Sequence, residues 1–491
     1  VAPANSIEFL IIMDAGSTGT RVHVYNHTAR VQYAHSFPVK VHQQLVVPEA
    51  LGDFSVSPGI SSFSGNPAGL EKYIAPLIQF AKELIVKKDK DARLDKVPLY
   101  LGATAGMRML DDVARGTIME ALRLFFRSSK CPFRPPRREQ VRVLAGEEEG
   151  AFGWLAANMA LNTLSSNPLT TYGALDLGGA SAQISFIPRF TSILSNMFPM
   201  HFGNYSDGPI HLYTHSFLQY GYVVGFQNSA KLKMKQAINR QFFHHPCLPS
   251  DVSWYTDLGQ FGVSTSGGHI ERASGQHAIH GSGDFIRCRA LANSMMNHRA
   301  ECPAEPCSMM SIYQPRLTTS RFLAFGGYME VFQMLNVSAE NPLPPLQQLE
   351  QRLATWCGMT SGEQSAASGL AIGTVGAKLE LSCWRAVWAL ELLTSGFGFP
   401  IDTRALTWGT DVDWTRGYAV YEVNFFPAHI LEEEDKLTLP TVELADARKE
   451  APSTVILSVP TAVMSGLALL FIGYVMGRAS PFRSAVDSPY R

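Results

Sequence analysis

The sequence lacks the excess of positive charge that is typical of nucleic-acid-binding proteins. Its 491 residues include 41 Lys and Arg against 42 Asp and Glu, which gives a formal net charge of −1. Without a basic field the chain would not attract a polyanion, so we expect no nucleic-acid partner. Because 46% of the residues are hydrophobic and only 17% are charged, the chain is also not disordered and can build one large or two medium-sized cores.

Cysteine is scarce, and its pattern does not indicate zinc. No two of the seven cysteines form the Cys-x-x-Cys pair that is typical of zinc sites. Six of them fall in the C-terminal half: Cys247, Cys288, Cys302, Cys307, Cys357 and Cys383. An oxidising compartment would favour pairing among these six, although spacing alone leaves their connectivity open. Cys131 is the odd one out.

One segment carries no charge at all. Residues 454–477 (TVILSVPTAVMSGLALLFIGYVMG) are uncharged and long enough to cross a bilayer core, which is about 30 Å thick. The alternative, a buried core helix, is disfavoured because the run is long and is followed by arginines. We therefore predict a transmembrane helix at 454–477, an acidic stalk before it at 431–453 and a cytoplasmic tail at 478–491.

This topology places the rest of the chain outside the cytosol. The expected location is the lumen of the Golgi or another endomembrane compartment, or the cell exterior. Three Asn-x-Ser/Thr sequons, at Asn26, Asn204 and Asn336, permit N-glycosylation in those places. The C-terminal helix is the expected contact with the membrane, and the sequence does not indicate an oligomeric state.

A strand that ends in a glycine-rich turn occurs twice. Residues 8–14 (EFLIIMD) lead into AGSTGT and a second strand, and residues 172–176 (YGALD) lead into LGGASA and another strand. Helical patterns fill the intervals, and strands that alternate with helices favour an α/β fold. The repeated unit predicts two similar lobes, at 1–170 and 171–430, whose glycine tips face a shared cleft. Near its end the chain is expected to return to the first lobe.

The two glycine tips have the composition of phosphate-binding turns. Backbone N–H groups can surround a phosphate only where side chains leave room, so Gly, Ser and Thr dominate such turns. Residues 16–20 and 178–181 have this composition, although an ordinary hairpin turn would look similar. Asp14 and Asp176 end the two preceding strands and could hold a hard cation against the phosphates, directly or through water. This arrangement favours Ca²⁺ or Mg²⁺.

Three consecutive glutamates, Glu147, Glu148 and Glu149, follow a short strand and begin a helix. Carboxylates at a helix N-terminus are stabilised by the helix dipole, so solvated side chains could explain the run without any function. The glutamates are also flanked by glycines at the end of a strand, which is a position where a general base that activates water would be placed. No Cys/His or Ser/His motif indicates a covalent route.

Four segments resemble, in order, the first four apyrase-conserved regions of the ecto-nucleoside triphosphate diphosphohydrolases: DAGSTGTRVHVY (14–25), LGATAGMR (101–108), AGEEEGAFGW (145–154) and ALDLGGASAQISF (174–186). The likeness runs over about residues 7–430. The C-terminal part, including DVDWTRGYAVY (411–421), is similar to the Golgi and lysosomal nucleoside diphosphatase branch. The resemblance implies a two-lobed, actin-like (ribonuclease H-like) nucleotidase fold with the active site between the lobes.

The resemblance also implies roles for individual residues. Glu149 is expected to be the general base, with Ser181 and Gln183 holding the attacking water. Asp14 and Asp176 are expected to organise the water shell of the cation. Residues expected to hold the phosphates are Ser17, Thr18, Gly19, Thr104, Gly178, Gly179 and Ala180. The disulfides implied by the family are Cys302–Cys307 and Cys357–Cys383, with Cys247–Cys288 as a third.

One region departs from the family pattern, and it concerns the nucleobase. Residues 321–331 read RFLAFGGYMEV, with Gly326 and Gly327 where the family has bulkier residues. Tyr328 or Phe325 is expected to stack on the base instead, although an aromatic residue in an apolar segment is more often part of a core.

The sequence therefore predicts hydrolysis of the terminal phosphate of nucleoside tri- or diphosphates by a water molecule that Glu149 activates. A related exopolyphosphatase would share the fold and the phosphate tips. A membrane-tethered binding protein that has lost catalysis is the alternative from another class. The presence of Asp14, Glu149, Asp176, Ser181 and Gln183 disfavours a loss of catalysis.

Chelation of divalent cations should abolish phosphate release from nucleotides. The two aspartates can organise a hydrated hard cation, but they cannot replace its positive charge. Phosphate release is measured in excess chelator and again after millimolar Ca²⁺ or Mg²⁺ is added, and we expect loss and then recovery of turnover. Full turnover in excess chelator would contradict the predicted cation.

Overall fold

Two mixed β-sheets with helices on their faces make up most of the structure. The computed structural model describes residues 7–28, 46–164, 167–189, 192–200, 210–237, 242–256, 277–296, 301–317, 321–337, 343–368, 379–409 and 412–425. All of them belong to one unit of the chain, Val1–Glu432. The α/β class predicted from the alternation of strands and helices is confirmed.

The first sheet is built around a strand that is buried on both sides. Its order is β3-β2-β1-β4-β5, formed by β1 (Ile7–Ala15), β2 (Thr20–Thr28), β3 (Glu49–Val56), β4 (Leu99–Ala103) and β5 (Val141–Val143). β1 pairs antiparallel with β2 and parallel with β4. Ile11 and Met13 of β1 belong to one core, whereas Leu10 and Ile12 belong to another. The strand therefore reads as a continuous apolar run rather than an alternating one.

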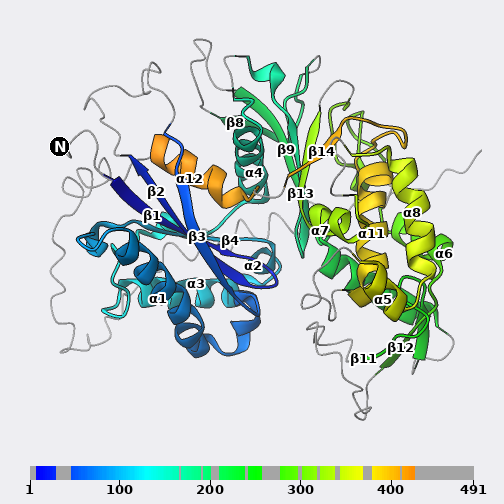
Figure 1. Ribbon diagram of the computed structural model, residues 1–491, viewed down its shortest axis with the longest axis horizontal. Helices are drawn as coiled ribbons and strands as arrows, with labels where there is room; N and C mark the ends of the chain where they lie inside the picture. The colour runs from blue at the N-terminus through cyan, green and yellow to red at the C-terminus, as the bar shows by residue number, and fades with distance from the viewer. Residues whose placement is uncertain are drawn as a thin grey trace, which may run out of the picture. The chain divides into compact units, whose positions relative to one another are not determined.

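Different helices cover the two faces of this sheet. The core that contains Ile11 and Met13 also takes in residues of α1 (Leu70–Lys88) and α3 (Asp112–Arg127). On the other face lies α12 (Trp414–Phe425), which contacts β1 through Tyr418 and Val423 (Figure 1). A hydrogen bond of 2.9 Å between the hydroxyls of Tyr25 and Thr415 joins β2 to α12. A segment from near the end of the described chain thus packs on the first sheet.

The second sheet also lies between helices. Its order is β14-β13-β6-β7-β9-β8, formed by β6 (Gly173–Leu177), β7 (Ser181–Phe186), β8 (Met197–Met200), β9 (Ile210–Leu218), β13 (Phe322–Gly326) and β14 (Leu406–Trp408). On one side α4 (Gly146–Ala160) packs through Ala151, Trp154 and Leu155. On the other side the helices α5 (Tyr222–Gln236), α7 (Gly327–Met334) and α11 (Ser382–Glu391) share a core with Leu175 and Ile184.

Seven further α-helices and strands complete the described part of the chain. They are α2 (Ala105–Arg108), β10 (Phe242–His245), β11 (Ser253–Thr256), β12 (His277–Gly281), α6 (Phe285–Ser294), α8 (Leu346–Gly358) and α9 (Ser361–Ala367). β10, β12 and β11 form a small third sheet in that order. A π-helical stretch, Leu392–Gly396, continues α11.

The three expected disulfides are present. They join Cys247 to Cys288, Cys302 to Cys307 and Cys357 to Cys383. Cys357 lies on α8 and Cys383 on α11, so this bond links two packed helices. Cys131 is buried and forms no disulfide.

The structure changes the interpretation of the sequons. Asn26 lies in β2 and is only 7% exposed, so its amide is not accessible to a glycosyl transfer in the folded chain. Asn336 follows α7 and is exposed. Asn204 lies outside the described residues. A sequence motif alone does not reveal burial in a strand, and the structure disfavours Asn26 as a site of glycosylation.

The membrane-related predictions fall outside the part of the chain that the structure describes. Among the described residues, no helix combines the length and the apolar character needed to cross a bilayer. The predicted stalk (431–453), transmembrane helix (454–477) and tail (478–491) are all beyond residue 425. The lobe boundaries at 170 and 430 stay predictions.

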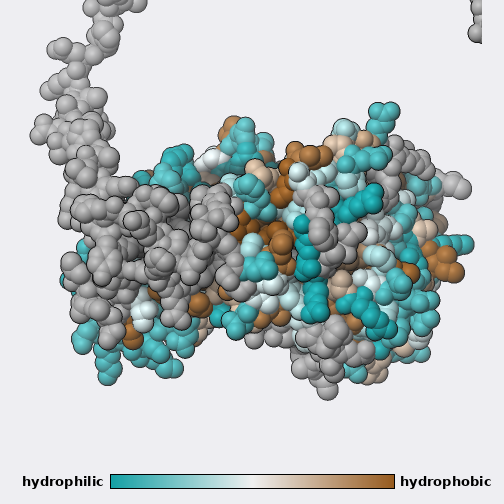
Figure 2. All heavy atoms as spheres, turned by 90° about the horizontal axis from the view of Figure 1, so that it is seen from above, coloured by the Kyte–Doolittle hydropathy of each residue, from teal (hydrophilic) through white to brown (hydrophobic). Residues whose placement is uncertain are grey.

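The surface is mixed in character. Figure 2 shows one face of the molecule, on which hydrophilic residues surround smaller groups of hydrophobic ones. The most exposed large apolar side chains include Val113 on α3 and Ile286 on α6. Single exposed apolar side chains are normal on folded proteins and need no partner to explain them.

Reduction of the disulfides should lower the melting temperature. Each bond that is lost typically costs about 2–5 kcal/mol of unfolding free energy in an extracellular domain. Thermal unfolding is measured with and without reductant, and the double variant Cys357→Ser, Cys383→Ser should show a smaller effect of reductant because one bond is already absent. A wild-type melting curve that ignores the reductant would mean that the cysteines are free in solution.

Candidate active site

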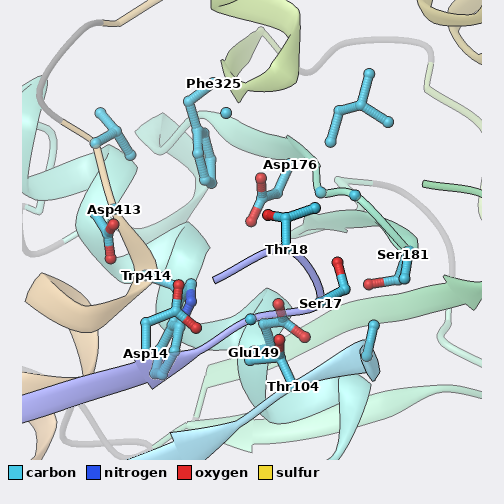
Figure 3. A pocket seen from close by; sticks show the side chains of 18 residues that line it. Asp14, Ser17, Thr18, Thr104, Glu149, Asp176, Ser181, Phe325, Asp413 and Trp414 are labelled. Atoms are coloured by element: carbon cyan, nitrogen blue, oxygen red, sulfur yellow. The ribbon is translucent and has the colours of Figure 1, made fainter. Parts of the chain in front are cut away.

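A pocket of about 210 Å³ lies where the glycine tips of both sheets meet the first residues of α4 and α12 (Figure 3). Most of the predicted site residues line it: Asp14, Ser17, Thr18, Thr104, Glu149, Asp176, Gly178, Gly179, Ala180, Ser181 and Phe325. Gly19, Gln183 and Tyr328 do not line it. Residues that are far apart in the sequence therefore converge on one small space.

The two glycine tips, residues 16–19 and 178–180, touch each other at this pocket. A Cβ atom at Gly179 would lie 2.7 Å from the hydroxyl oxygen of Ser17 and 3.0 Å from the methyl carbon of Thr18. Contacts this short would force the Ser17 and Thr18 side chains to move, so the absence of a side chain at Gly179 favours the close approach of the tips. The close approach lets both tips contribute to the same pocket.

The tips offer backbone donors to a ligand. Within the described residues, the N–H groups of Ser17, Thr18, Gly179 and Ala180 donate to no acceptor of the protein. Successive N–H groups in a turn form a concavity that attracts anions. This arrangement is suited to phosphate oxygens. Gly19 stands at the back of its tip, where a Cβ atom would lie 2.7 Å from the carbonyl oxygen of Val56.

The polar face of β7 supports the wall of the pocket. Ala182 and Ile184 point into the core, whereas Ser181 and Gln183 alternate with them and face the start of α4. The Gln183 amide nitrogen donates to the Ser181 hydroxyl at 2.7 Å, and the other amide atom, Oε1, is buried with no partner in the described structure. Gln183 thus lies directly behind Ser181 and fixes its hydroxyl.

Arg108 connects Glu149 with Ser181. Its guanidinium donates to Oε2 of Glu149 at 2.5 Å and, more weakly, to the Ser181 hydroxyl at 3.4 Å. Glu149 is only 7% exposed, so this is a largely buried ion pair. The sequence reasoning did not single out Arg108. The signal in the sequence was that Arg108 is the one basic residue of the segment LGATAGMR.

The three consecutive glutamates have different surroundings. Glu148 binds both terminal nitrogens of Arg142, at 2.6 and 2.7 Å, and also accepts from the Ala145 N–H at 3.0 Å. The Glu147 side chain is 41% exposed. Of the three, Glu149 lines the pocket. Helix geometry explains the difference, because consecutive residues point in directions about 100° apart.

The carboxyl groups of the pocket are in an unfavourable environment for charge. Burial raises the pKa of Glu149, Arg108 lowers it, and the charge of Asp413 raises it again. The pKa of Asp14 is well above its usual value because of burial, then of Asp413, Glu149 and Asp176. Burial, followed by Glu149 and Asp413, raises the pKa of Asp176 in the same way. The fold thus holds several carboxyl groups together in a place that disfavours the negatively charged form of each.

These residues fit a hydrated divalent cation. Oδ1 of Asp14 is buried and has no hydrogen-bond partner among the described residues. Carboxylate oxygens are the ligands that Ca²⁺ and Mg²⁺ prefer, and a positive charge would relieve the repulsion. The described residues contain no group of three or more His, Cys, Asp or Glu side chains close enough to hold a metal directly. Contact through water molecules suits this spacing, because Mg²⁺ usually keeps several of its waters.

Asp413 and Trp414 line the pocket as well, and the sequence reasoning did not assign them to the site. Both lie at the start of α12. They belong to the segment DVDWTRGYAVY, which resembles a family segment but gave no reason to expect site residues there. Their approach to Asp14 depends on the packing of α12 against β1, which no local pattern reveals.

The two aromatic candidates for the nucleobase differ. Phe325 lines the pocket, although it is only 2% exposed. Tyr328 is completely buried in the core of α7 and offers no ring face to a base. The neighbouring Gly326 is explained by its backbone, because its φ of 63° is in the left-handed region and a Cβ atom would lie 2.5 Å from Oδ1 of Asp176.

Comparison with known families agrees with this geometry. Residues 1–440 match the GDA1/CD39 (nucleoside phosphatase) family. The chain belongs to this family. Hydrolysis of nucleoside tri- and diphosphates is typical of the GDA1/CD39 family, and the apyrases and nucleoside triphosphate diphosphohydrolases are among its members.

Similar proteins come from plants, animals and parasites. "Probable apyrase 4" of Arabidopsis thaliana is 32% identical over 330 residues, which are 65% of this chain and 60% of that protein. "Ectonucleoside triphosphate diphosphohydrolase 2" of Homo sapiens is 29% identical over 86% of this chain and 84% of its own length. A nucleoside triphosphate hydrolase structure from Neospora caninum has a TM-score of 0.59 at 15% identity, over 86% of this chain and 93% of that one. This likeness shows that the chain has the two-lobed, actin-like GDA1/CD39 fold.

Removal of the Arg108 charge should shift the pH dependence of the reaction. Arg108 lowers the pKa of Glu149, so Arg108→Gln should raise it, and a base that must be deprotonated then works only at higher pH. We expect the acidic limb of the kcat/KM profile to move up by roughly one pH unit or more. Arg108→Lys keeps the charge and should move it less. An unshifted acidic limb in Arg108→Gln would mean that another group sets it.

Proposed function

We propose that the chain hydrolyses the terminal phosphate of nucleoside tri- or diphosphates by direct attack of a water molecule. The observation that carries the proposal is the position of Glu149, which lines the same pocket as both glycine tips and Ser181 and shares the Arg108 guanidinium with Ser181. The tips can hold the phosphates while Glu149 faces the space in which a water molecule would stand. Positioning and charge stabilisation supply most of the catalysis in phosphoryl transfer.

The step balances without any covalent intermediate. Glu149 accepts a proton from the water as its oxygen attacks the terminal phosphorus, with Ser181 orienting the water and Gln183 holding Ser181. The bond from that phosphorus to its bridging oxygen breaks, and the leaving nucleotide takes the electron pair. Ser17, Thr18 and the amides of the second tip stabilise the charge on the phosphate oxygens. A Ca²⁺ or Mg²⁺ ion near Asp14 and Asp176, when bound, would neutralise part of that charge.

The raised pKa of Glu149 supports its role as a base. A base works best when its pKa approaches the working pH, and burial moves the pKa of Glu149 in that direction. Arg108 limits the shift and keeps the carboxylate oriented through the 2.5 Å hydrogen bond. Glu148 is less suited, because Arg142 and the Ala145 N–H occupy its oxygens.

Substrate and location are further parts of this proposal. The likeness to the nucleoside diphosphatase branch supports diphosphates as substrates in the lumen of the Golgi or a related compartment. The disulfides support an oxidising environment, since such bonds persist outside the cytosol. We propose that residues 454–477 anchor the chain in the membrane.

A panel of nucleoside tri-, di- and monophosphates and inorganic polyphosphate tests the substrate class by release of phosphate. Phosphate from polyphosphate alone would favour the exopolyphosphatase alternative, and none from any substrate would favour the binding protein.

Glu149→Gln should lower kcat by at least about a hundredfold and leave nucleotide binding nearly intact, because general-base catalysis is typically worth 10²–10⁴. The amide keeps the size of the side chain and can still accept from Arg108, so proton acceptance is what it loses. Phosphate release under single-turnover conditions and nucleotide binding by calorimetry are measured on the same preparation.

Glu147→Gln is the matched control, because Glu147 has the same chemistry two residues away but is partly exposed, lies 3.5 Å from His215 and does not line the pocket. Its rate should stay near wild type. Glu148→Gln is a poorer control, since it breaks the pair with Arg142. A fully active Glu149→Gln protein would overturn the mechanism.

A further inference from the structure

Asp413 has two carboxylate oxygens in different surroundings. Oδ1 accepts a hydrogen bond of 2.8 Å from the Thr415 N–H, which caps the first turn of α12. Oδ2 lies 3.7 Å from Nε2 of His23, too far for a hydrogen bond. The side chain is about one-third exposed and lines the pocket that also contains Asp14 and Asp176 (Figure 3). One oxygen therefore serves the helix, and the other is available to the pocket.

Capping alone does not account for a charged residue at this position. Asn and Ser cap helices about as well as Asp, and neither would add a negative charge to a pocket that already holds three carboxylates. That charge is unfavourable for its neighbours, since Asp413 lines the same small pocket as Asp14 and Asp176 and adds to the repulsion between them. In the described structure neither of these two aspartates has a lysine or arginine nitrogen within 4.0 Å, and Arg21 is paired with Asp53.

Two unpartnered polar atoms next to Asp413 indicate a missing ligand. Nε2 of His23 is buried without a hydrogen-bond partner among the described residues, and His23 is only 9% exposed. Oδ1 of Asp14 is buried and unpartnered as well. Buried polar atoms are normally satisfied by protein or by ordered groups such as water or an ion. A hydrated cation between the carboxylates would supply both the charge and the water molecules that these atoms need.

We propose that Asp413 is a third carboxylate of the cation site, in addition to Asp14 and Asp176, that it contacts the ion through water molecules, and that it enables the nucleotide-free protein to bind a hard divalent cation. The affinity of a site for such an ion rises with the negative charge that surrounds it. Two aspartates form a weak site that phosphates would have to complete, whereas three can hold the hydrated ion before the nucleotide arrives. The anionic nucleotide then enters a pocket whose negative charge is already reduced. The inference rests on the proposed function, because it concerns the same pocket.

The test is Ca²⁺ binding to the full chain in the absence of nucleotide, measured by calorimetry. Asp413→Asn removes the charge but keeps a good helix cap, so the fold is preserved. We expect its dissociation constant for Ca²⁺ to rise by about tenfold or more, since one negative charge beside the hydrated ion is lost. Asp53→Asn removes a nearby carboxylate that does not line the pocket, and it should bind Ca²⁺ like the wild type. Asp413→Ser, which also caps, replaces Asp413→Asn if that variant does not fold.

Thermal unfolding separates the cation role from a purely structural one. In chelator, Asp413→Asn should melt at the wild-type temperature or above it, because a repulsive charge has gone. The rise in melting temperature that Ca²⁺ causes should be smaller than in the wild type, because a ligand stabilises the folded state according to its affinity. A variant that loses stability in chelator and keeps its Ca²⁺ affinity would show that Asp413 is only a helix cap.

Asp14→Asn separates this inference from the proposed function. If Asp14→Asn weakens Ca²⁺ binding and Asp413→Asn does not, Asp413 is not a ligand and the proposed hydrolysis stands. If the wild type binds no Ca²⁺ without nucleotide, the inference is overturned, whereas phosphate release with nucleotide still tests the hydrolysis separately. Luminescence of Tb³⁺ excited through tryptophan gives a second readout, because Trp414 lines the pocket.

Discussion

Four carboxylates surround one small pocket, and their burial together with their mutual repulsion is the constraint on which the site depends. Asp14, Glu149, Asp176 and Asp413 come from two sheets and two helices, and Arg108 pairs with one of them. Burial raises the pKa values of Asp14 and Asp176, so their ionisation in the folded chain is unfavourable, and without a cation their contribution to stability is lost as pH rises through these pKa values. A cation that binds only the folded state would recover this free energy.

The sheets supply the rigidity that such a site requires. β1 is buried by helices on both faces, and β7 directs alternate side chains into a core and toward α4. Each strand therefore holds the residue at its end in a fixed place. The tips then meet because Gly179 allows the backbone of one to lie against Ser17 of the other. Residues held at the ends of packed strands are preorganised, which is the arrangement that electrostatic catalysis needs.

The parts of the site that sequence could predict are those written in local patterns. Asp14 and Asp176 each end an apolar strand before a glycine turn, and Glu149 follows a strand at a helix start. Arg108 and Asp413 escaped prediction because their partners are distant in the chain: Arg108 binds Glu149, and Asp413 reaches the pocket only through the packing of α12 on β1. The sequence also did not reveal which side chains are buried: Tyr328 and the sequon residue Asn26 are both enclosed in the folded chain. The disulfide pairs were predicted from the family resemblance, because the spacing of the cysteines does not determine their connectivity.

The central claim is that water attacks the terminal phosphorus directly, with Glu149 as the base and no covalent intermediate. The most direct measurement is the stereochemical course at phosphorus, followed with a nucleoside triphosphate whose terminal thiophosphate is made chiral with oxygen isotopes and hydrolysed in isotopically labelled water. A single in-line displacement inverts the configuration, whereas two successive displacements through a phosphoenzyme restore it. The account predicts inversion in the released thiophosphate. Retention would contradict it.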